Sequence, residues 1–306
     1  MDVVTYHDLQ TILKDPFENF EPAASTTLHS HVYPYFVQWC RDKSRRGVRW
    51  IHTYHAFYSE EAEGRHLLPW EEEINRTLID VACYADVRIS VSRWQQRHLA
   101  DLGINSVYLP NGVDVSLCDA GVASRFSAAH GDDPFVLYVG RDESVKNPAD
   151  FVRLAARLPE NRFVMIGDGL SLSSHSEWRN VLTDNVILLG RQQRSTVQDA
   201  MAACTAVVVT SVKEGLPTVV LEALTHGKPV VVPDDPGCME PVAGKEFGLV
   251  YRQGDIESLT SMTEAAISGK SYFPEGRETA LGEYDWKVIG PKLDAIYDGA
   301  DSSYHE

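Results

Sequence analysis

From Pro134 onward the chain alternates short apolar runs with segments of helical pattern, and this alternation constrains the fold more than any other feature. Runs such as "FVLYVG", "NVILLG" and "KPVVVPD" are almost continuous in Val, Ile and Leu. Strands of that composition are buried on both faces, and strands that alternate with helices form a parallel sheet. The pattern predicts a doubly wound α/β domain, whose ligands bind outside the carboxyl ends of the strands.

The residues before Pro134 repeat this pattern less regularly. Strands are expected at "STTLHSHV", "VRWIHTYHAF", "DVRISVS" and "SVYLP", with helices between them. One of those helices should begin at Ser92, because Gln95 stands three residues later as in a capping box. The stretch from "NGVD" to "GDDP" is rich in Gly, Ala, Ser and Asp, which indicates a connection between two α/β halves.

Length and charge narrow the class of protein. A chain of 306 residues with 43% hydrophobic residues is expected to form two globular domains. Its net charge of -16 argues against nucleic acid and anionic membranes as partners, because both attract a basic surface. The exception is the basic run "RDKSRRGVR", Arg41 to Arg49, which is interpreted as a solvated helix end, with contact to a membrane surface as the alternative.

Five scattered cysteines, with no Cys-x-x-Cys pair, indicate neither a disulfide framework nor a thiolate zinc site. The segment "MDVVTYHDLQ" lacks the basic and apolar regions of a signal peptide, and no apolar run approaches the roughly 18 residues that span a membrane. A cytoplasmic protein is therefore expected, peripheral at the membrane at most.

The sequence leaves the oligomeric state open.

Two carboxylates in "SVKEGLPTVVLEAL" flank the expected start of a helix. Pro217 suits its first turn and Gly227 its end, which places Glu214 in the loop after a strand and Glu222 inside the helix. The two glutamates could form a general acid and base pair, or they could simply be solvated. The unpaired N–H groups at the helix N-terminus between them, however, form an anion site. Carboxylates beside an anion site suit hydroxyl groups, so the segment predicts a sugar-nucleotide site.

Cations for the phosphates of such a ligand follow another strand of the same sheet. In "VLYVGRDESVKNP", Arg141 comes directly after the strand, and Lys146 precedes Asn147 and Pro148, which suit the start of a helix. Surface solvation is the alternative for both cationic side chains. Their place beside the glutamate loop favours a role in binding pyrophosphate.

Taken together, these segments resemble the retaining glycosyltransferases of family 4, which have the two-domain GT-B fold. The matching pieces, in the family's order, are "YLPNGVD", "VLYVGRDESVKNP", "VMIGDG", "NVILLGRQ", "AVVVTSVKEGLPTVVLEALTHGKPVVVPD" and "YDWKVIGPKLDAIYD". They cover nearly all of the chain from about Ser106 onward. The resemblance implies two Rossmann-like domains that face a cleft, at 1–112 and 113–283, and a helix within 284–306 that crosses back to the first domain.

The resemblance also assigns roles to individual residues. Arg141 and Lys146 would neutralise the donor pyrophosphate, Glu214 would contact hydroxyls of the transferred sugar, and Glu222 would bind the ribose. Backbone N–H groups after Glu214 would help to hold sugar and phosphate, and the segment after "NVILL" would lie along the base. The residues so assigned to donor binding are Arg141, Lys146, Gly190, Arg191, Glu214, Gly215, Leu216, Thr218, Val219 and Glu222.

Histidines of the first domain match the family as well. "LHSHVYPYF" resembles its His-x-His strand end, and "WIHTYHAFY" resembles its apolar strand that ends in an active-site histidine. By position His55 matches that histidine, with His52 as the second choice. The predicted catalytic set is His55, Arg141, Lys146 and Glu214. Two alternatives stay open for the histidines: a structural role, and a zinc site formed by His29, His31, His52 and His55.

The first domain departs from the family at its start. Family members usually open with a strand and a Gly-rich loop near donor and acceptor, which "MDVVTYHDLQTILKD" lacks, and the domain is short. This leaves a partner subunit or an unusual acceptor surface as ways to bind the acceptor.

The function implied by the resemblance is retaining transfer of a sugar from a nucleoside-diphosphate sugar to an acceptor hydroxyl of unknown identity. Neither a metal nor another cofactor is expected, because no Asp-x-Asp motif stands in a suitable place. Two alternatives remain: a nucleotide-sugar epimerase of the same fold, and a non-catalytic protein that binds sugar nucleotides. A dehydrogenase is disfavoured, since no Gly-x-Gly-x-x-Gly follows a strand.

Overall fold

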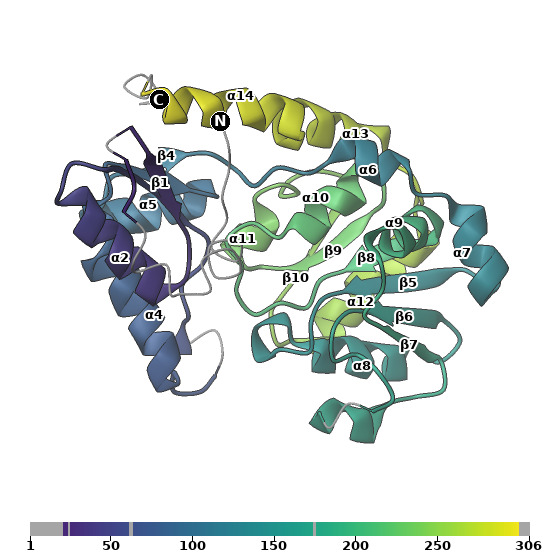
Figure 1. Cartoon of the computed structure of the whole chain (residues 1–306). Coiled ribbons are helices and arrows are strands. Elements are labelled where there is room, and N and C mark those ends of the chain that lie inside the picture. Colours follow the sequence, from purple (N-terminus) through teal and green to yellow (C-terminus); the bar gives the residue numbers. More distant parts are fainter. Residues whose placement is uncertain (1–20, 24, 61–63, 174–175, 300–306) are drawn as a thin grey trace.

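The computed structural model describes residues 21–23, 25–60, 64–173 and 176–299. The segment at the N-terminus that departs from the family pattern lies outside these residues. Figure 1 shows two α/β lobes side by side, with a yellow C-terminal helix that lies along both. One lobe contains a four-stranded sheet of order β1-β2-β3-β4, and the other a six-stranded sheet of order β10-β9-β8-β5-β6-β7. All pairings between these strands are parallel, which confirms the predicted fold class.

The first sheet is built from the runs predicted to be strands. Trp50 and Tyr54 of its second strand are fully buried, and they pack with Leu78 and Leu99 from the helices that cover the sheet. The elements are β1 (Thr27–Ser30), α2 (Pro34–Ser44), β2 (Arg49–Tyr54), α4 (Pro69–Asp80), a 3₁₀ turn (Ala82–Tyr84), β3 (Val87–Ser90), α5 (Arg93–Asp101) and β4 (Val107–Tyr108).

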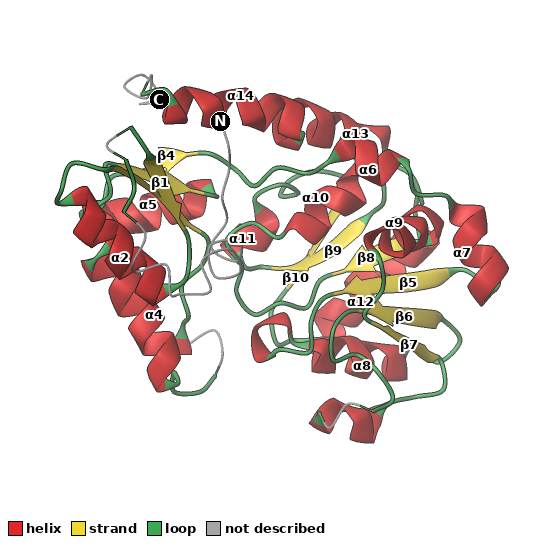
Figure 2. Ribbon diagram, in the orientation of Figure 1, coloured by secondary structure: helices red, strands yellow, loops and turns green. Residues whose placement is uncertain are grey.

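The second sheet has a core on each face, and helices lie on both sides of its yellow strands in Figure 2. In its first strand, Phe135 and Leu137 enter one core, whereas Val136 and Tyr138 enter the other. Because side chains alternate along a strand, a strand buried on both faces is apolar at successive positions. The elements are β5 (Phe135–Val139), a 3₁₀ turn (Ser144–Lys146), α8 (Pro148–Arg157), β6 (Arg162–Ile166), a 3₁₀ turn (Glu177–Val181), β7 (Val186–Gly190), α9 (Arg194–Ala203), β8 (Ala206–Val208), α10 (Thr218–Thr225), β9 (Val230–Pro233), α11 (Pro236–Met239), β10 (Gly248–Tyr251) and α12 (Ile256–Ser268).

The chain then returns to the first domain, as the resemblance implied. Ile289 and Ile296 of the last helix pack against Ile51 of the first sheet. The guanidinium of Arg49 donates to the carbonyl of Ile296 at 2.6 Å and to that of Tyr297. These bonds satisfy two of the carbonyl groups that a helix leaves free at its end. The elements are α13 (Pro274–Thr279), a π-helical turn (Ala280–Tyr284) and α14 (Trp286–Tyr297).

Helix α5 begins at the predicted place. Ser92 is its N-cap, and its hydroxyl accepts a hydrogen bond from the N–H of Gln95 at 3.2 Å. The Gln95 side chain accepts from the N–H of Val91 at 3.1 Å, one residue earlier than in a capping box. A carboxylate of the second domain, that of Glu240, accepts from the N–H of Arg93 at 2.7 Å. The start of α5 is therefore a point of contact between the domains.

The stretch predicted as a connection between the domains contains two helices, which its weak periodicity did not indicate. These helices are α6 (Val115–Asp119) and α7 (Ala123–His130). Asp114 caps the first of them, since its side chain accepts from the N–H of Leu117 at 3.0 Å. Phe126 of the second is buried in a core of the second domain. Helices this short carry too few apolar residues to produce a clear helical period.

The basic run at Arg41 to Arg49 is not simply a solvated helix end, which corrects the expectation for two of its members. Lys43 is 4% exposed and lies 5.4 Å from the centroid of the Trp39 ring, and its ammonium contacts Glu21 at 2.6 Å. Arg49 holds the end of α14. Long cationic side chains can bury their stems while the charged group finds a partner, which charge counting does not reveal.

Candidate functional site

Two loops that follow the neighbouring strands β5 and β8 are tied together. The N–H of Val212 donates to the carbonyl of Val145 at 2.9 Å. Lys146 follows Val145 directly and Glu214 comes two residues after Val212, and their ammonium and carboxylate form a hydrogen-bonded ion pair. Their side chains are 26% and 13% exposed, so the pair is partly desolvated but still reaches solvent. The loops thus bring a predicted phosphate ligand and a predicted sugar ligand into contact.

Close backbone packing places the Glu214 loop against the first domain. A Cβ on Gly215 would lie 1.5 Å from the carbonyl oxygen of His55, so only glycine fits there. A Cβ on Gly237 would lie 2.1 Å from the carbonyl oxygen of Glu214. The N–H of Glu214 donates to the carboxylate of Asp235 at 3.2 Å. Gly215, the residue after Glu214, therefore packs against the backbone of His55, the predicted active-site histidine.

Sequence reasoning missed two residues that hold this loop. Asp235 is buried, and besides Glu214 its carboxylate accepts from the N–H groups of Gly237 and Cys238, each at 3.1 Å. An aspartate before a proline at a helix start signals such a cap. The second residue is Asn111, in "PNG", whose side-chain amide donates to the carbonyl of Leu216 at 2.7 Å. No local pattern pairs Asn111 with a residue so far along the chain.

Glu222 lies one turn into α10, on the helix predicted to hold it. The Gln198 amide of α9 donates to its carboxylate at 3.1 Å, and a guanidinium nitrogen of Arg194 lies 3.6 Å away. Burial raises the pKa of Glu222, although Gln198 and Arg194 oppose that shift. Thr218 and Val219 are the first residues of α10, where N–H groups have no carbonyl partner within the helix. The Glu222 carboxylate and the free N–H groups at the start of α10 therefore belong to one helix.

The remaining donor residues predicted from the sequence lie at the same edge of the sheet. Arg141 follows β5, and its side chain is 65% exposed and pairs with Glu143 at 3.1 Å. Gly190 ends β7 with a φ of 63°, in the region that favours glycine, and its carbonyl accepts from the N–H of Gly167 at 2.9 Å. Arg191 follows it and is exposed. Their roles as donor ligands stay predictions.

The imidazole of His55 bonds to a second histidine. Nδ1 of His31 lies 2.8 Å from Nε2 of His55. Burial, together with the charge of His31, lowers the pKa of His55 to about 4. A histidine with so low a pKa is neutral near pH 7, so it can donate or accept a hydrogen bond but carries no charge there.

The other two histidines bond to hydroxyl groups. His29 contacts the hydroxyls of Tyr297 and Thr53, each at 2.7 Å, and Nδ1 of His52 contacts the hydroxyl of Ser30 at 2.8 Å. Among the described residues, no group of three or more His, Cys, Asp or Glu side chains is arranged to hold a metal ion. The structure therefore gives no support to the zinc alternative, and it favours a structural role for His29 and His52.

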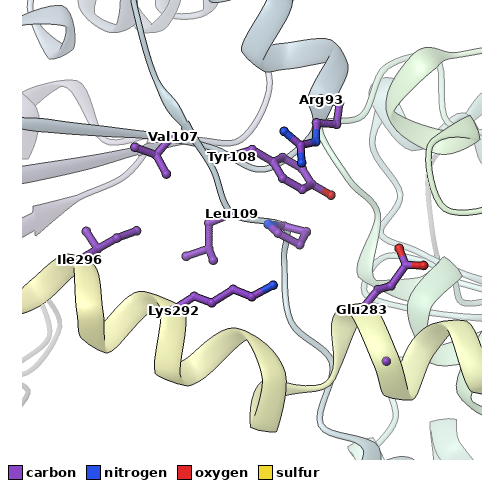
Figure 3. A pocket seen from close by; sticks show the side chains of 9 residues that line it. Arg93, Val107, Tyr108, Leu109, Glu283, Lys292 and Ile296 are labelled. Atoms are coloured by element: carbon purple, nitrogen blue, oxygen red, sulfur yellow. The ribbon is translucent and has the colours of Figure 1, made fainter. Parts of the chain in front are cut away.

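Pockets adjoin the loops that follow β5 and β8. Two pockets of about 450 and 490 Å³ share Asn147 and Val212 as lining residues. A smaller pocket of about 210 Å³ lies elsewhere, between β4, the start of α5 and α14 (Figure 3). In that pocket the guanidinium of Arg93 lies 3.9 Å from the centroid of the Tyr108 ring, and Lys292 extends from α14. Its lining includes none of the residues predicted for catalysis or donor binding.

Models of two protein families match the chain. "Glycosyl transferases group 1" matches residues 123–280, which is more than half of the chain. "Glycosyltransferase Family 4" matches residues 23–117. The two matches fall on the second and the first sheet respectively. Within the described residues, none of the helices combines the length and the apolar character needed to cross a bilayer.

Three curated relatives are glycosyltransferases. D-inositol 3-phosphate glycosyltransferase of Mycobacteroides abscessus is 27% identical over 309 residues, which are 93% of this chain and 68% of the relative. Lipopolysaccharide 1,6-galactosyltransferase of Salmonella typhimurium is 27% identical over 292 residues, 88% of this chain and 75% of the relative. D-inositol 3-phosphate glycosyltransferase of Mycolicibacterium smegmatis is 26% identical over 245 residues, 76% of this chain and 55% of the relative. The chain thus spans between about half and three quarters of their lengths.

Solved structures share the architecture of both lobes. HepE of Anabaena, in a complex with UDP-glucose, aligns with a TM-score of 0.76 at 20% identity and covers 89% of this chain and 78% of its own. Sucrose-phosphate synthase of Thermosynechococcus elongatus aligns with a TM-score of 0.75 at 21% identity, covering 90% and 73%. These likenesses support the GT-B fold. By the extent of the family match, the chain belongs to the glycosyl transferases group 1 family and is a glycosyltransferase of the GT-B fold.

Proposed function

We propose that the enzyme moves a sugar from a nucleoside-diphosphate sugar to an acceptor hydroxyl, with retention at the anomeric carbon. The observation that carries this proposal is the Lys146–Glu214 ion pair beside the start of α10, with His55 on the opposing loop. A cation, a carboxylate and free N–H groups in one place match a ligand that has both phosphates and sugar hydroxyls.

Each end of the donor meets different groups. The diphosphate lies at the start of α10, near Lys146, with Arg141 at the rim. The transferred sugar lies on the side of Glu214 and His55, and the ribose hydroxyls bond to Glu222. The base lies along Gly190 and Arg191 at the end of β7. HepE, whose complex with UDP-glucose has the same fold, supports a donor of this class.

The reaction breaks the bond between the anomeric carbon and the diphosphate oxygen, and the diphosphate leaves with the bonding electrons. The oxocarbenium-like sugar is attacked on the same face by the acceptor hydroxyl. The proton of that hydroxyl passes to an oxygen of the leaving diphosphate, so that the products are a glycoside and a nucleoside diphosphate. Lys146, Arg141 and the N-terminus of α10 stabilise the charge that develops on the leaving group. Neither Glu214 nor Glu222 transfers a proton in this scheme.

The names of the curated relatives suggest acceptor classes. Two of the curated relatives are named D-inositol 3-phosphate glycosyltransferase and one lipopolysaccharide 1,6-galactosyltransferase. Polyols and sugar hydroxyls are therefore the first acceptor classes to supply in an assay.

A panel of UDP-, GDP-, ADP- and TDP-sugars tests the donor. A ligand that binds only the folded state raises the melting temperature. We expect one nucleotide class to raise it, and the same donor to yield nucleoside diphosphate once an acceptor is supplied. A lack of any shift across the panel contradicts the donor site, and an epimerised sugar nucleotide formed without acceptor contradicts glycosyl transfer.

A further inference from the structure

The bond between His31 and His55 follows from the architecture of the first sheet. His31 comes directly after β1 and His55 directly after β2, and these two strands are parallel neighbours. Side chains that follow adjacent parallel strands meet at the same edge of the sheet. The two ring centroids are 5.1 Å apart and the ring planes are inclined by 31°, so the contact runs through ring nitrogens rather than through stacked faces.

The bond leaves one nitrogen of His55 for a substrate. A neutral imidazole has one N–H donor and one acceptor nitrogen. Nε2 of His55 contacts Nδ1 of His31 at 2.8 Å, which leaves Nδ1 as the nitrogen of His55 that can address a ligand. The bond also restricts rotation of the ring about its side-chain torsions.

His31 is itself held in place from the other side. Its ring stacks on that of His29, with centroids 4.6 Å apart and planes inclined by 26°. Both nitrogens of His29 are bonded, to the hydroxyl of Tyr297 and to that of Thr53. Tyr297 belongs to α14, the helix that returns from the second domain. His31 thus lies between a fixed ring and His55.

We propose that His31 is the positioning residue of His55: it fixes the ring orientation and tautomer, and so presents Nδ1 of His55 to the bound substrates. The proposal deepens the function proposed above and rests on it, because it requires that His55 acts in transfer. His31 acts through His55 and does not bind the donor.

Two substitutions separate the hydrogen bond from the ring stack. His31→Phe keeps an aromatic ring against His29 but removes Nδ1. His31→Asn loses the ring but keeps a polar amide near the position of Nδ1. His31 is exposed, so both variants are expected to fold. His130→Phe, on α7 of the other domain, controls for the loss of a histidine.

Kinetics and NMR test the proposal together. His31→Phe should lower kcat roughly 10- to 100-fold, as expected for a misplaced reacting group, with the donor KM unchanged. His31→Asn should recover most of the loss, and His130→Phe should match the wild type. Long-range ¹H–¹⁵N spectra should show one tautomer of His55 in the wild type and a mixture in His31→Phe.

The two proposals fail differently. A wild-type kcat in His31→Phe, with His55→Phe inactive, overturns the positioning role and leaves the proposed function standing. A tautomer mixture at His55 in the wild type also overturns it. Full turnover in His55→Phe overturns both the positioning role and the assignment of His55 to catalysis.

Discussion

Lys146 and Glu214 form an ion pair between the loops that leave two neighbouring parallel strands, β5 and β8. An ammonium has three N–H donors, so Lys146 can bond to Glu214 and to a phosphate oxygen at the same time. In the proposed donor site, the pair would hold the phosphate ligand Lys146 and the sugar ligand Glu214 at a fixed separation before the donor binds. Such preorganisation lowers the cost of ordering side chains on binding.

Lys146→Met should weaken donor binding more than Arg141→Met does. A hydrogen bond to a charged group contributes about 1.5–3 kcal/mol, which corresponds to a loss of about 10- to 100-fold in affinity for Lys146→Met. Arg141 is exposed and already paired with Glu143, so solvent screens its charge. Arg141→Met should therefore lower donor affinity only a few-fold. Titration calorimetry with the preferred nucleotide sugar measures both. Equal losses of affinity, or a larger loss for Arg141→Met, would contradict the proposed placement of Lys146 nearer than Arg141 to the diphosphate.

Gly215→Ala should separate the Glu214 loop from His55. The new Cβ would fall 1.5 Å from the carbonyl oxygen of His55, and a backbone oxygen has little freedom to move away. We expect a stability loss of about 1–3 kcal/mol, typical of overpacking, together with a strong loss of turnover. Chemical denaturation and an initial-rate assay follow the two effects.

Gly290→Ala in α14 is the matched control for that substitution. A Cβ there meets nothing within 4 Å, so the change should leave turnover intact and stabilise the helix by about 0.5–1 kcal/mol. If Gly215→Ala and Gly290→Ala have the same turnover and stability, the close approach of the Glu214 loop to His55 is not required for activity.

Acid should remove the stability contributed by Glu71. The guanidinium of Arg65 bonds to its carboxylate at 2.6 and 2.8 Å, and the N–H of Leu68 bonds to it at 2.7 Å. The hydrogen bonds from Arg65 lower the pKa of Glu71 below its ordinary value of 4.5. A lowered folded-state pKa means that the stabilisation is complete above pH 4.5 and is lost as the pH falls through the folded-state pKa.

Glu71→Gln tests this acid dependence. The variant should lose about 1.5–3 kcal/mol at pH 7, and its stability should fall less steeply than that of the wild type below pH 4.5. Urea unfolding between pH 7 and pH 3 provides the comparison. Parallel curves with a constant offset would show that Glu71 keeps its ordinary pKa in the folded protein.

Transfer should persist in the presence of a chelator. In the proposed mechanism Lys146, Arg141 and the N-terminus of α10 supply the positive charge that the leaving diphosphate needs. An initial-rate assay in excess EDTA should therefore match the untreated enzyme. A loss of turnover that added Mg²⁺ restores would assign that charge to a metal ion.

Features set by neighbouring residues were predictable from the sequence. The Val-rich runs became strands of the second sheet, "PTVVLEALTHG" formed α10, and "DWKVIGPKLDAIY" formed α14 with Asp285 as its cap. Each depends on a local pattern, such as an apolar period, a capping side chain or a proline at a helix start. The place of Glu214 in a loop and of Glu222 in a helix followed from the same patterns.

Contacts between distant segments could not be predicted in the same way. The bond between His31 and His55 and the packing of Gly215 on His55 join separate loops. Arg49 shows the same limit, because its partners at the end of α14 lie far along the chain. The residue type determines which groups each of these residues can bond to or pack against, but the tertiary fold determines which of those groups lies within reach.

The central claim is that Glu214 binds the transferred sugar, and Glu214→Ala tests it most directly. Initial rates with the preferred donor should fall by roughly 100-fold or more, as when one stabilising contact of a transition state is removed, while circular dichroism shows an intact fold. Glu264→Ala, an exposed position on α12, should retain the wild-type rate. Turnover near the wild-type level in a folded Glu214→Ala variant would contradict the account.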